Sequence, residues 1–342
     1  MSHSKTIFVT GGTGFLGSYL IRYLLKNRSG TVRALKRPTS SMALLQNVEE
    51  QIDWVEGDIL DIPLLEDALE GVDEIYHCAA VVSFDPRHLK MMMEINVTGT
   101  ANIINIALTK DIKKFIHVSS IAAIGRAEGK AQVFENTKWQ DSKFNSNYAI
   151  SKYLAEKEAW RGEAEGLNIA IVNPSVIIGS GFWKNGTARF WPQVFNGLKF
   201  YPKGGSGFVD VRDVAKYMIQ LMESDITSQR FLLNGDNLTF RNFFNLIAQQ
   251  LGKSEPKFKV NTFIAETAWR LEKIRAMITG KSPLITKETA RNSSQTYIYN
   301  NQKALAAIDF NFTPIIHTIE ETSRQYLEAE NNGEAPMSLP LV

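Results

Sequence analysis

The sequence predicts an α/β protein built on a doubly wound parallel sheet. Two observations support this fold class. Short apolar strands alternate with helical segments through the first half of the chain, and residues 7–17 run from a buried strand through a glycine-rich turn into a helix. Strict alternation of strands and helices is typical of parallel strands joined by right-handed crossovers. The strands are expected at residues 7–9, 31–35, 52–55, 74–80, 114–120 and 168–172.

The helices between these strands are predicted from apolar side chains that recur at helical spacing. Leu16, Leu20 and Leu24 would pack one face of the first helix against the sheet. Two longer helical patterns cover residues 92–108 and 148–164. Because each helix presents one apolar stripe, all three fit the covering layers of a two-sided parallel sheet.

After Pro174 the pattern changes, and we expect a smaller mixed region that binds substrate. Residues 179–207 hold glycines, tryptophans and prolines, as expected for a long functional loop region. Further elements are predicted at residues 208–211 (strand), from Asp213 (helix), 231–233 (strand), 240–251 (helix) and 261–278 (helix).

We therefore divide the chain as follows. The dinucleotide-binding domain covers residues 1–175, with 208–235 returning to it. The substrate-binding region combines residues 176–207 and 236–328. Residues 329–342, with their Asn-Asn-Gly stretch and spaced prolines, are expected to form a flexible tail.

Composition excludes several classes of protein. The net charge of the 342 residues is only +2, so nothing favours nucleic acid or an anionic membrane as a partner. Cys78 is the single cysteine, so no disulfide can form within the chain, which suits a reducing compartment. No apolar run is long enough to span a bilayer. We expect a cytoplasmic protein with a small-molecule substrate and no bound metal.

The glycine turn predicts a dinucleotide site. Gly12-x-Gly14-x-x-Gly17 fits the common fingerprint, and Gly11-x-x-Gly14-x-x-Gly17 fits a rarer spacing. Glycines allow a tight turn, and their missing side chains let a pyrophosphate approach the N-terminus of the helix. There the free N–H groups and the positive end of the helix dipole meet the negative charge.

The end of the second strand indicates which nucleotide is bound. An NAD site usually places an acidic residue there to hold the ribose hydroxyls. This chain has Lys36 and Arg37 instead, and a guanidinium suits a 2′-phosphate. We therefore expect NADP(H), with NAD(H) as the alternative. Asp58, after the third strand, is placed to meet the adenine.

Tyr148 and Lys152 indicate acid/base chemistry. They are four residues apart, so on a helix they share a face. A neighbouring ammonium favours a phenolate, and we expect Lys152 to lower the pKa of Tyr148. Ser119 and Ser120 end the fifth strand, at the carboxyl edge of the sheet where ligands of such folds bind.

These motifs together resemble the short-chain dehydrogenase/reductase superfamily, and their spacing is similar to its extended branch of epimerase/dehydratase-like proteins. The resemblance extends to about residue 325. It rests on residues 10–17, Ala79-Ala80, Asn96-Val97-x-Gly99-Thr100, Val118-Ser119-Ser120, Tyr148-x-x-x-Lys152 and Asn173-Pro174.

The resemblance implies a Rossmann fold and a role for each motif. Tyr148 would be the acid/base residue, Lys152 would also hold the nicotinamide ribose, and Ser120, rather than Ser119, would polarise the substrate oxygen. Asn96 would steady the base of the cleft or join a proton relay. The implied cofactor-binding residues are Gly11, Thr13, Gly14, Phe15, Leu16, Gly17, Lys36, Arg37, Asp58, Ile59, Ala79, Ala80, Asn96, Tyr148, Lys152 and Pro174.

The same resemblance narrows the reaction. Dehydratases of the branch carry an Asp-Glu pair after the serine, whereas Ile121 and Ala122 stand here. Many epimerases carry a diphosphate-binding arginine two residues before the aromatic residue at position 208, whereas Ser206 stands here. The second strand, Val32-Arg33-Ala34-Leu35-Lys36-Arg37-Pro38, is similar to the dihydroflavonol reductase and 3β-hydroxysteroid dehydrogenase-like group.

An apolar substrate is expected as well. Aromatic side chains are frequent where substrate would bind, and we expect some to belong to the core and others to line the pocket. We therefore predict an NADP(H)-dependent carbonyl reductase or alcohol dehydrogenase; the alternatives are an NAD-dependent nucleotide-sugar 4-epimerase and a non-catalytic nucleotide-binding protein. The aromatic residues are Phe84, Phe182, Trp183, Phe190, Trp191, Phe195 and Phe200.

A homodimer is also implied, because in many relatives the helices at 92–108 and 148–164 pair across a dimer axis. Apolar side chains of these helices could serve that face or the core. They are Ile95, Ile103, Ile106, Tyr153, Leu154 and Trp160.

Overall fold

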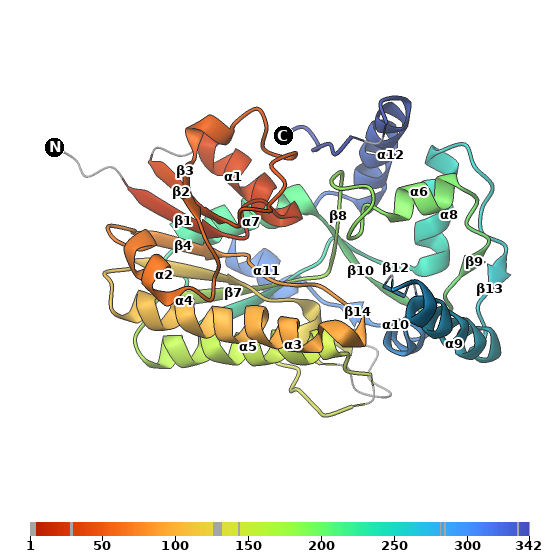
Figure 1. Cartoon of the computed structure of the whole chain (residues 1–342), viewed down its shortest axis with the longest axis horizontal. Helices are drawn as coiled ribbons and strands as arrows, with labels where there is room; N and C mark the ends of the chain where they lie inside the picture. The colour runs from red at the N-terminus through yellow and green to blue at the C-terminus, as the bar shows by residue number, and fades with distance from the viewer. Residues whose placement is uncertain are drawn as a thin grey trace.

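The computed structural model describes residues 5–27, 30–125, 132–142, 144–280, 282–283, 285–333 and 335–341. A seven-stranded parallel sheet forms the larger part of the molecule, in the order β11-β7-β5-β4-β1-β2-β3 (Figure 1). Its strands are β1 (Thr6–Thr10), β2 (Thr31–Lys36), β3 (Asp53–Glu56), β4 (Glu74–His77), β5 (Lys114–Val118), β7 (Ile169–Pro174) and β11 (Gln229–Leu233).

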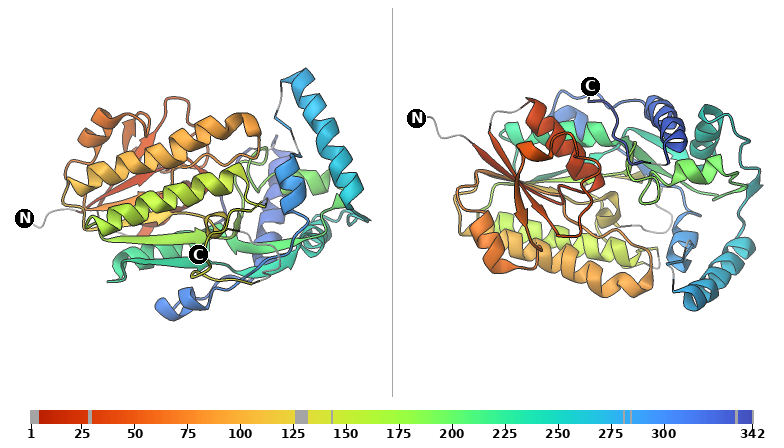
Figure 2. Two further views of the ribbon diagram at one scale, coloured as in Figure 1. Left: turned by 90° about the horizontal axis from the view of Figure 1, so that it is seen from below. Right: turned by 45° about the horizontal axis from the view of Figure 1, so that its top comes forward.

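Helices cover both faces of this sheet (Figures 1 and 2). Successive side chains of a strand point to opposite faces, so Ile7 and Val9 join the core on one side while Phe8 joins the core on the other. One face carries α1 (Phe15–Asn27) and α7 (Val211–Glu223), and the other carries α2 (Ile62–Ala68), α4 (Gly99–Leu108) and α5 (Asn147–Ala164). The doubly wound α/β prediction is therefore confirmed.

The order of the strands determines where a ligand can bind. From β1 the chain moves outward to β2 and β3, then returns to the opposite side of β1 with β4 and β5. The connections leaving β1 and β4 therefore diverge, and the ligand crevice of such sheets is expected at the carboxyl ends of these two strands.

A second, smaller region lies beyond β7. Its three-stranded sheet has the order β12-β10-β8, with β10 and β12 antiparallel and β10 and β8 parallel. The elements are β8 (Val176–Ile178), β10 (Gly205–Asp210), β12 (Asp236–Thr239), α6 (Phe190–Phe195), α8 (Phe240–Gln250) and α12 (Ile315–Asn331).

Most of the aromatic residues expected around the substrate belong to the core of this second region. Trp183 and Trp191 are fully buried there, and Phe190 and Phe195 pack against the same cluster. In the core their rings bury large apolar areas, which accounts for their placement. By contrast, Phe84 lies apart from this cluster and keeps 36% of its surface exposed.

The strand expected at residues 208–211 differs from the prediction. It is β10, which ends at Asp210 and belongs to the smaller sheet, while Val211 already begins α7. The Asp210 side chain accepts the backbone N–H of Arg212, so Asp210 is the N-cap and the helix begins two residues before the predicted start at Asp213.

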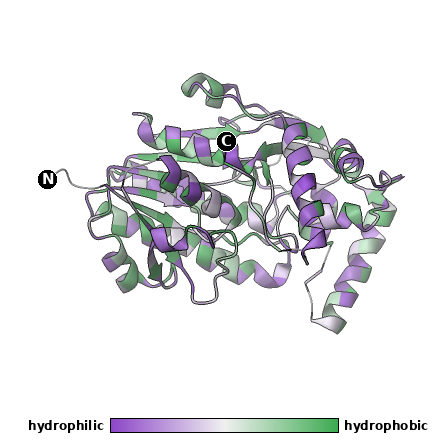
Figure 3. Cartoon of the chain, turned by 90° about the horizontal axis from the view of Figure 1, so that it is seen from above, coloured by the Kyte–Doolittle hydropathy of each residue, from purple (hydrophilic) through white to green (hydrophobic). Residues whose placement is uncertain are grey.

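The remaining elements are short or peripheral. Helix α9 (Thr262–Thr279) lies at the edge of the molecule next to α10 in both Figure 1 and Figure 2. In Figure 3 the strands of the large sheet are mostly hydrophobic, whereas the helices carry both colours. The others are α3 (Leu89–Met92), a π-helical turn (Met93–Thr98), α10 (Lys287–Asn292), α11 (Gln302–Ala307), β6 (Gln132–Val133), β9 (Phe200–Tyr201), β13 (Phe258–Lys259) and β14 (Ile298–Tyr299).

The prediction of a loose tail at residues 329–342 is wrong for its described part. Helix α12 continues to Asn331, and the segment after it runs back to α1 (Figure 1). Leu339 is only 1% exposed and joins the core beside α1. Its backbone N–H donates to the Tyr19 hydroxyl at 2.6 Å, and that hydroxyl donates to the Ser180 carbonyl at 2.8 Å.

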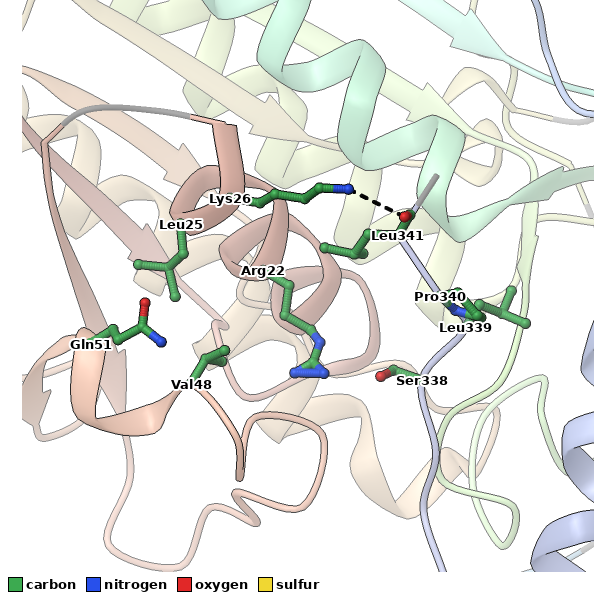
Figure 4. Close-up of a pocket in the computed structure, with 9 residues that line it drawn as sticks. All are labelled: Arg22, Leu25, Lys26, Val48, Gln51, Ser338, Leu339, Pro340 and Leu341. Carbon is green, nitrogen blue, oxygen red and sulfur yellow. Dashed lines mark hydrogen bonds between the residues drawn. The ribbon is translucent and has the colours of Figure 1, made fainter.

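The polar residues of this tail predicted that it would be exposed. Instead, the burial of Leu339 and its hydrogen bond to Tyr19 hold the tail against the rest of the molecule. A pocket of about 340 Å³ remains between the tail and α1, and the Lys26 ammonium donates to the Leu341 carbonyl at its rim (Figure 4). Its lining comes from Arg22, Leu25, Lys26, Val48, Gln51, Ser338, Leu339, Pro340 and Leu341.

Among the described helices, none combines the length and apolar character needed to cross a bilayer. In the same part of the chain, no three His, Cys, Asp or Glu side chains are grouped as metal ligands would be.

We predict that Leu339→Ala lowers the free energy of unfolding by about 2–4 kcal/mol, because it removes a buried side chain and leaves a cavity. Urea denaturation measures the change. The matched control is Leu305→Ala, where the side chain is 39% exposed and the cost should stay below about 1 kcal/mol. An equal loss of unfolding free energy in the two variants would show that the tail does not pack on α1.

Candidate active site

The glycine turn after β1 is shaped by two close approaches. Gly11 has a φ of +68°, and a Cβ there would lie 2.7 Å from the backbone nitrogen of Ala79. A Cβ on Gly17 would collide with the Gly11 carbonyl, so α1 can pack against the turn only with glycine at that position. Both glycines therefore serve the packing of the loop itself.

The open side of the turn is formed by Gly14, which is exposed. Helix α1 begins at the next residue, Phe15, and has no acidic side chain in its first turn. The first N–H groups of a helix have no partner within it and carry partial positive charge. This part of the turn fits a diphosphate, with the half-buried Thr13 and Phe15 beside it, while Leu16 and Gly17 are buried behind it.

A buried hydrogen-bond chain connects the turn to the neighbouring strand, and sequence reasoning missed it. His77, the last residue of β4, bonds Thr10 Oγ1 through Nδ1 at 2.7 Å and Thr100 Oγ1 through Nε2 at 2.9 Å. The Thr100 hydroxyl donates to the Asn96 carbonyl at 2.6 Å. Since that proton is already used, His77 Nε2–H donates to Thr100, and the Thr10 hydroxyl donates to His77 Nδ1.

The direction of this chain requires a neutral His77. Burial lowers its pKa to about 3, and the Lys152 ammonium acts in the same direction. Thr10 Oγ1 in turn accepts the backbone N–H of Ala79 at 3.2 Å. His77 thus fixes the backbone at Ala79 and the exposed Ala80, the two residues predicted to line the cofactor cleft.

Asn96 lies at the base of the crevice, within the π-helical turn. Its Oδ1 accepts the N–H of Val81 at 2.7 Å, and its Nδ2 donates to the Val81 carbonyl and to Ser151 Oγ, both at 3.0 Å. Asn96 therefore joins the segment after β4 to α5. A π-turn re-aims a helical side chain, which accounts for its presence at this position.

The structure separates the two serines at the end of β5. Ser119 is buried, and its hydroxyl donates to Glu156 Oε2 at 2.5 Å. Ser120 is half-buried, and its Oγ accepts the N–H of Ala122 at 3.1 Å. A side-chain hydrogen bond also links Ser120 to Tyr148. Ser120 alone therefore points to the expected acid/base residue.

Tyr148 lies in the first turn of α5, whose N-cap is Ser146. Its ring meets the Phe84 ring edge-on, with centroids 6.0 Å apart. Burial raises the pKa of Tyr148, and the hydrogen bond from Ser120 opposes that rise. The expected net lowering of this pKa is not found, because desolvation of the phenolate outweighs the influences that favour it.

Lys152 follows one turn later and is 2% exposed. Its Nζ donates to the Val118 carbonyl at 2.8 Å, at the end of β5. Burial lowers its pKa to about 8, although the nearby Glu156 carboxylate favours the charged form. The ammonium therefore lies between α5 and the sheet edge, on the same helix face as Tyr148.

The end of β2 holds both basic residues, but in different environments. The Lys36 ammonium lies 3.5 Å from the Glu56 carboxylate, so its charge is already paired. Arg37 is exposed, and within the described part of the chain its guanidinium forms no hydrogen bond or ion pair. Of the two, Arg37 is the cation available to an anionic ligand.

The remaining predicted residues lie around the same crevice or behind it. Asp58 is half-buried, and its Oδ1 accepts the N–H of Leu60 at 3.0 Å. Ile59 is buried against the position of Gly99 and contributes to the core. Pro174 is buried as the last residue of β7.

A family model supplies the decisive comparison. The model described as the NAD dependent epimerase/dehydratase family matches residues 7–232. The chain belongs to this family. The match covers β1 through β11 nearly completely, and therefore the whole seven-stranded sheet and the Ser120–Tyr148–Lys152 site.

Relatives within the epimerase/dehydratase family include named reductases. A Synechocystis sp. protein provisionally named dihydroflavonol 4-reductase is 33% identical over 307 residues, which cover 87% of this chain and 88% of that protein. Cinnamoyl-CoA reductase 1 of Petunia hybrida is 27% identical over 338 residues, which cover 95% of this chain and 92% of that protein. The crystal structure of gox2253 superimposes with a TM-score of 0.80 at 28% identity, covering 96% of this chain and 99% of that one.

These comparisons confirm that the chain is an NAD(P)-dependent oxidoreductase of the extended short-chain dehydrogenase/reductase type, similar to the dihydroflavonol reductase group.

Because His77 and His117 are buried, we predict that the stability of the folded protein depends on pH. His77 has a folded pKa of about 3, and burial also lowers the pKa of His117 well below its usual value, whereas unfolded histidine titrates near 6.5. The unfolded chain therefore binds more protons, so stability is complete above about pH 6.5 and falls as the pH drops. Each histidine contributes up to about 1.4 kcal/mol per pH unit.

Urea denaturation between pH 4.5 and 7 measures this slope. We expect His117→Phe to flatten it, because a ring of similar size no longer takes up a proton. His317→Gln, on an exposed side chain, should leave it unchanged. The explanation would be wrong if the wild type and His117→Phe had identical slopes.

Proposed function

We propose that this protein is an NADP(H)-dependent carbonyl reductase or alcohol dehydrogenase acting on a small, largely apolar ketone or alcohol. The observation that carries the proposal is the hydrogen bond between Ser120 and Tyr148, with Lys152 one helical turn away. The reductase names of the relatives agree with it.

The bound nicotinamide would supply or accept the hydride. Tyr148 would be protonated at neutral pH, because burial raises its pKa, and it could donate that proton to the oxygen of a ketone. The Lys152 ammonium would stabilise the phenolate left behind. Ser120 Oγ accepts a backbone N–H, so its one proton, which is directed at Tyr148 in the free enzyme, could turn to the same substrate oxygen.

The cofactor would lie along the crevice between the ends of β1 and β4. The open face at Gly14 would hold the diphosphate, and Lys152 would hold the nicotinamide ribose. Asp58 would meet the adenine, and Arg37 would bind the 2′-phosphate of NADP(H). Ala79 and Ala80 would line the floor that His77 and Asn96 fix in place.

An apolar substrate is favoured by the residues next to Tyr148. The partly exposed Phe84 ring meets the Tyr148 ring. Ile121 and Ala122 are buried directly after Ser120 and carry no acid or base for an elimination step. A carbonyl flanked by apolar groups would therefore meet Phe84 on one side and the two hydroxyls on the other.

The nucleotide-sugar 4-epimerase has less support. It would use the same tyrosine, lysine and serine, but a sugar diphosphate needs a cation near its phosphates. Two residues before Phe208 stands Ser206, which is buried in β10, so no guanidinium occupies that position. A purified protein carrying slowly exchanging NAD(H) would favour the epimerase.

A homodimer through α4 and α5 stays a prediction. Ile103 and Ile106 lie in the protomer core, so they cannot form the expected face. The Tyr153 ring stacks on Trp139, and Trp160 donates to Glu156. An interface on these helices would depend on other residues, such as the exposed Ile150. The cytoplasmic location also stays a prediction.

We predict that Tyr148→Phe lowers kcat for NADPH-dependent ketone reduction by about 10²- to 10⁴-fold, because it removes the proton donor. NADPH affinity, measured by nicotinamide fluorescence, should change little. Tyr153→Phe is the matched control on the same helix. Retention of wild-type turnover by Tyr148→Phe would refute the proposed acid/base role.

We predict that Arg37→Asp weakens NADPH binding by at least tenfold, since a charge-assisted contact contributes about 1.5–3 kcal/mol. NADH binding should be unchanged or stronger. Fluorescence titration with both nucleotides measures the ratio, and Lys90→Asp controls for a change of charge on an exposed helix. Equal changes in the affinities for NADPH and NADH would show that Arg37 does not distinguish the two nucleotides, which would contradict the proposed preference for NADP(H).

A further inference from the structure

Glu156 is a buried carboxylate one helical turn beyond Lys152 on α5. It is 2% exposed and takes hydrogen bonds from four side chains. Oε2 accepts from Ser119 Oγ at 2.5 Å and from Asn173 Nδ2 at 2.7 Å, and Oε1 accepts from Trp160 Nε1 at 3.3 Å. Oε1 also forms an ion pair with Arg230 Nη1 at 2.6 Å.

Arg230 connects this carboxylate to the edge of the sheet. It lies on β11, and its guanidinium also donates to the backbone carbonyls of Glu135 and Thr137. The Glu135 carboxylate accepts the N–H of Leu232 at 2.9 Å. Since a buried charge is costly without partners, these contacts compensate the buried Glu156 carboxylate and fix it in one orientation.

One route leads from Glu156 to Ser120 through Asn173. The same Nδ2 that donates to Glu156 lies 3.0 Å from the Ser120 carbonyl and donates to it. Ser119 is held by the carboxylate directly. The backbone on both sides of the Ser119–Ser120 peptide is therefore held, and with it the direction of the Ser120 hydroxyl toward Tyr148.

A second route is electrostatic and leads to Lys152. The titratable groups facing this ammonium are Tyr148 and Glu156 on α5, His77 and Cys78 at the end of β4, and His117 on β5. Burial keeps both histidines uncharged and raises the pKa of the Cys78 thiol to about 12, so the thiol is neutral as well. Of these groups, Glu156 therefore supplies the negative charge.

We infer that Glu156 is a positioning residue of the active site, which holds Ser120 in place through Asn173 and keeps Lys152 charged. The inference rests on the proposed function, because it assigns Glu156 to the Ser120–Tyr148–Lys152 reaction. Without its carboxylate, burial alone acts on the Lys152 ammonium, which would lose its proton at a lower pH.

The direct test is the titration of Lys152 itself, which needs no substrate. NMR of protein labelled with ¹⁵N and ¹³C in lysine follows the Lys152 Nζ and Cε signals, assigned by their loss in Lys152→Met. In Glu156→Gln we expect the Lys152 midpoint to fall by about one pH unit. Glu158→Gln, which removes the same charge from the same helix beside Arg161, should leave it unchanged.

Further variants separate the effect of the Glu156 charge from the effect of its side-chain length. Glu156→Asp keeps the charge but shortens the side chain, so the Lys152 midpoint should stay near that of the wild type. If Glu156→Gln fails to fold because Arg230 has lost its ion-pair partner, the double variant Glu156→Gln/Arg230→Gln replaces it. This variant is neutral at both positions, and the same test applies to it. An unchanged Lys152 midpoint in the glutamine variant would overturn the inference.

Activity gives the second measurement. The alkaline limb of the kcat/KM profile for NADPH-dependent ketone reduction should move to lower pH in Glu156→Gln, by the same amount as the Lys152 midpoint. A fall in activity with an unmoved pH profile would show a merely structural role. If Tyr148→Phe retained turnover while the Lys152 midpoint still shifted, the proposed function would fail and the Glu156–Lys152 coupling would stand.

Discussion

The buried ammonium of Lys152 is the constraint around which the site is arranged. A charge removed from water is costly, and burial lowers its pKa to about 8. The Val118 carbonyl and the Glu156 carboxylate offset that cost, while the neighbouring His77 and His117 remain neutral and add no repulsion. These contacts tie α5 to the end of β5.

The parallel sheet makes this arrangement possible, because it brings the carboxyl ends of β1, β4, β5 and β7 to one edge. Polar residues at or next to these strand ends have buried partners: Thr10 and His77 bond each other, and Asn173 joins Ser120 to Glu156. The glycine turn and α5 are therefore held by one connected set of hydrogen bonds, which suits a reaction that needs fixed geometry.

The sequence predicted this fold class well, because buried strands and amphipathic helices have distinct periods and the glycine turn has a fixed spacing. It also favoured Ser120 over Ser119, although only by resemblance. It missed the roles of His77 and Glu156, since a histidine or glutamate within an ordinary strand or helix gives no signal until the fold supplies its partners. Two expectations, a lowered pKa of Tyr148 and a loose tail around Leu339, differ from the structure for the same reason. The raised pKa and the packed tail both depend on burial, which no local sequence pattern shows.

The central claim is that a hydride passes between a free nicotinamide cofactor and an apolar carbonyl at the Tyr148 edge of the sheet. It is tested most directly with NADPH deuterated at C4 and a panel of hydrophobic ketones, with the product analysed by mass spectrometry. The account predicts that one NADPH is oxidised for each alcohol released and that the deuterium is found on the former carbonyl carbon. It would be contradicted if no carbonyl compound consumed NADPH while a tightly held NAD(H) supported the interconversion of sugar nucleotides without net oxidation.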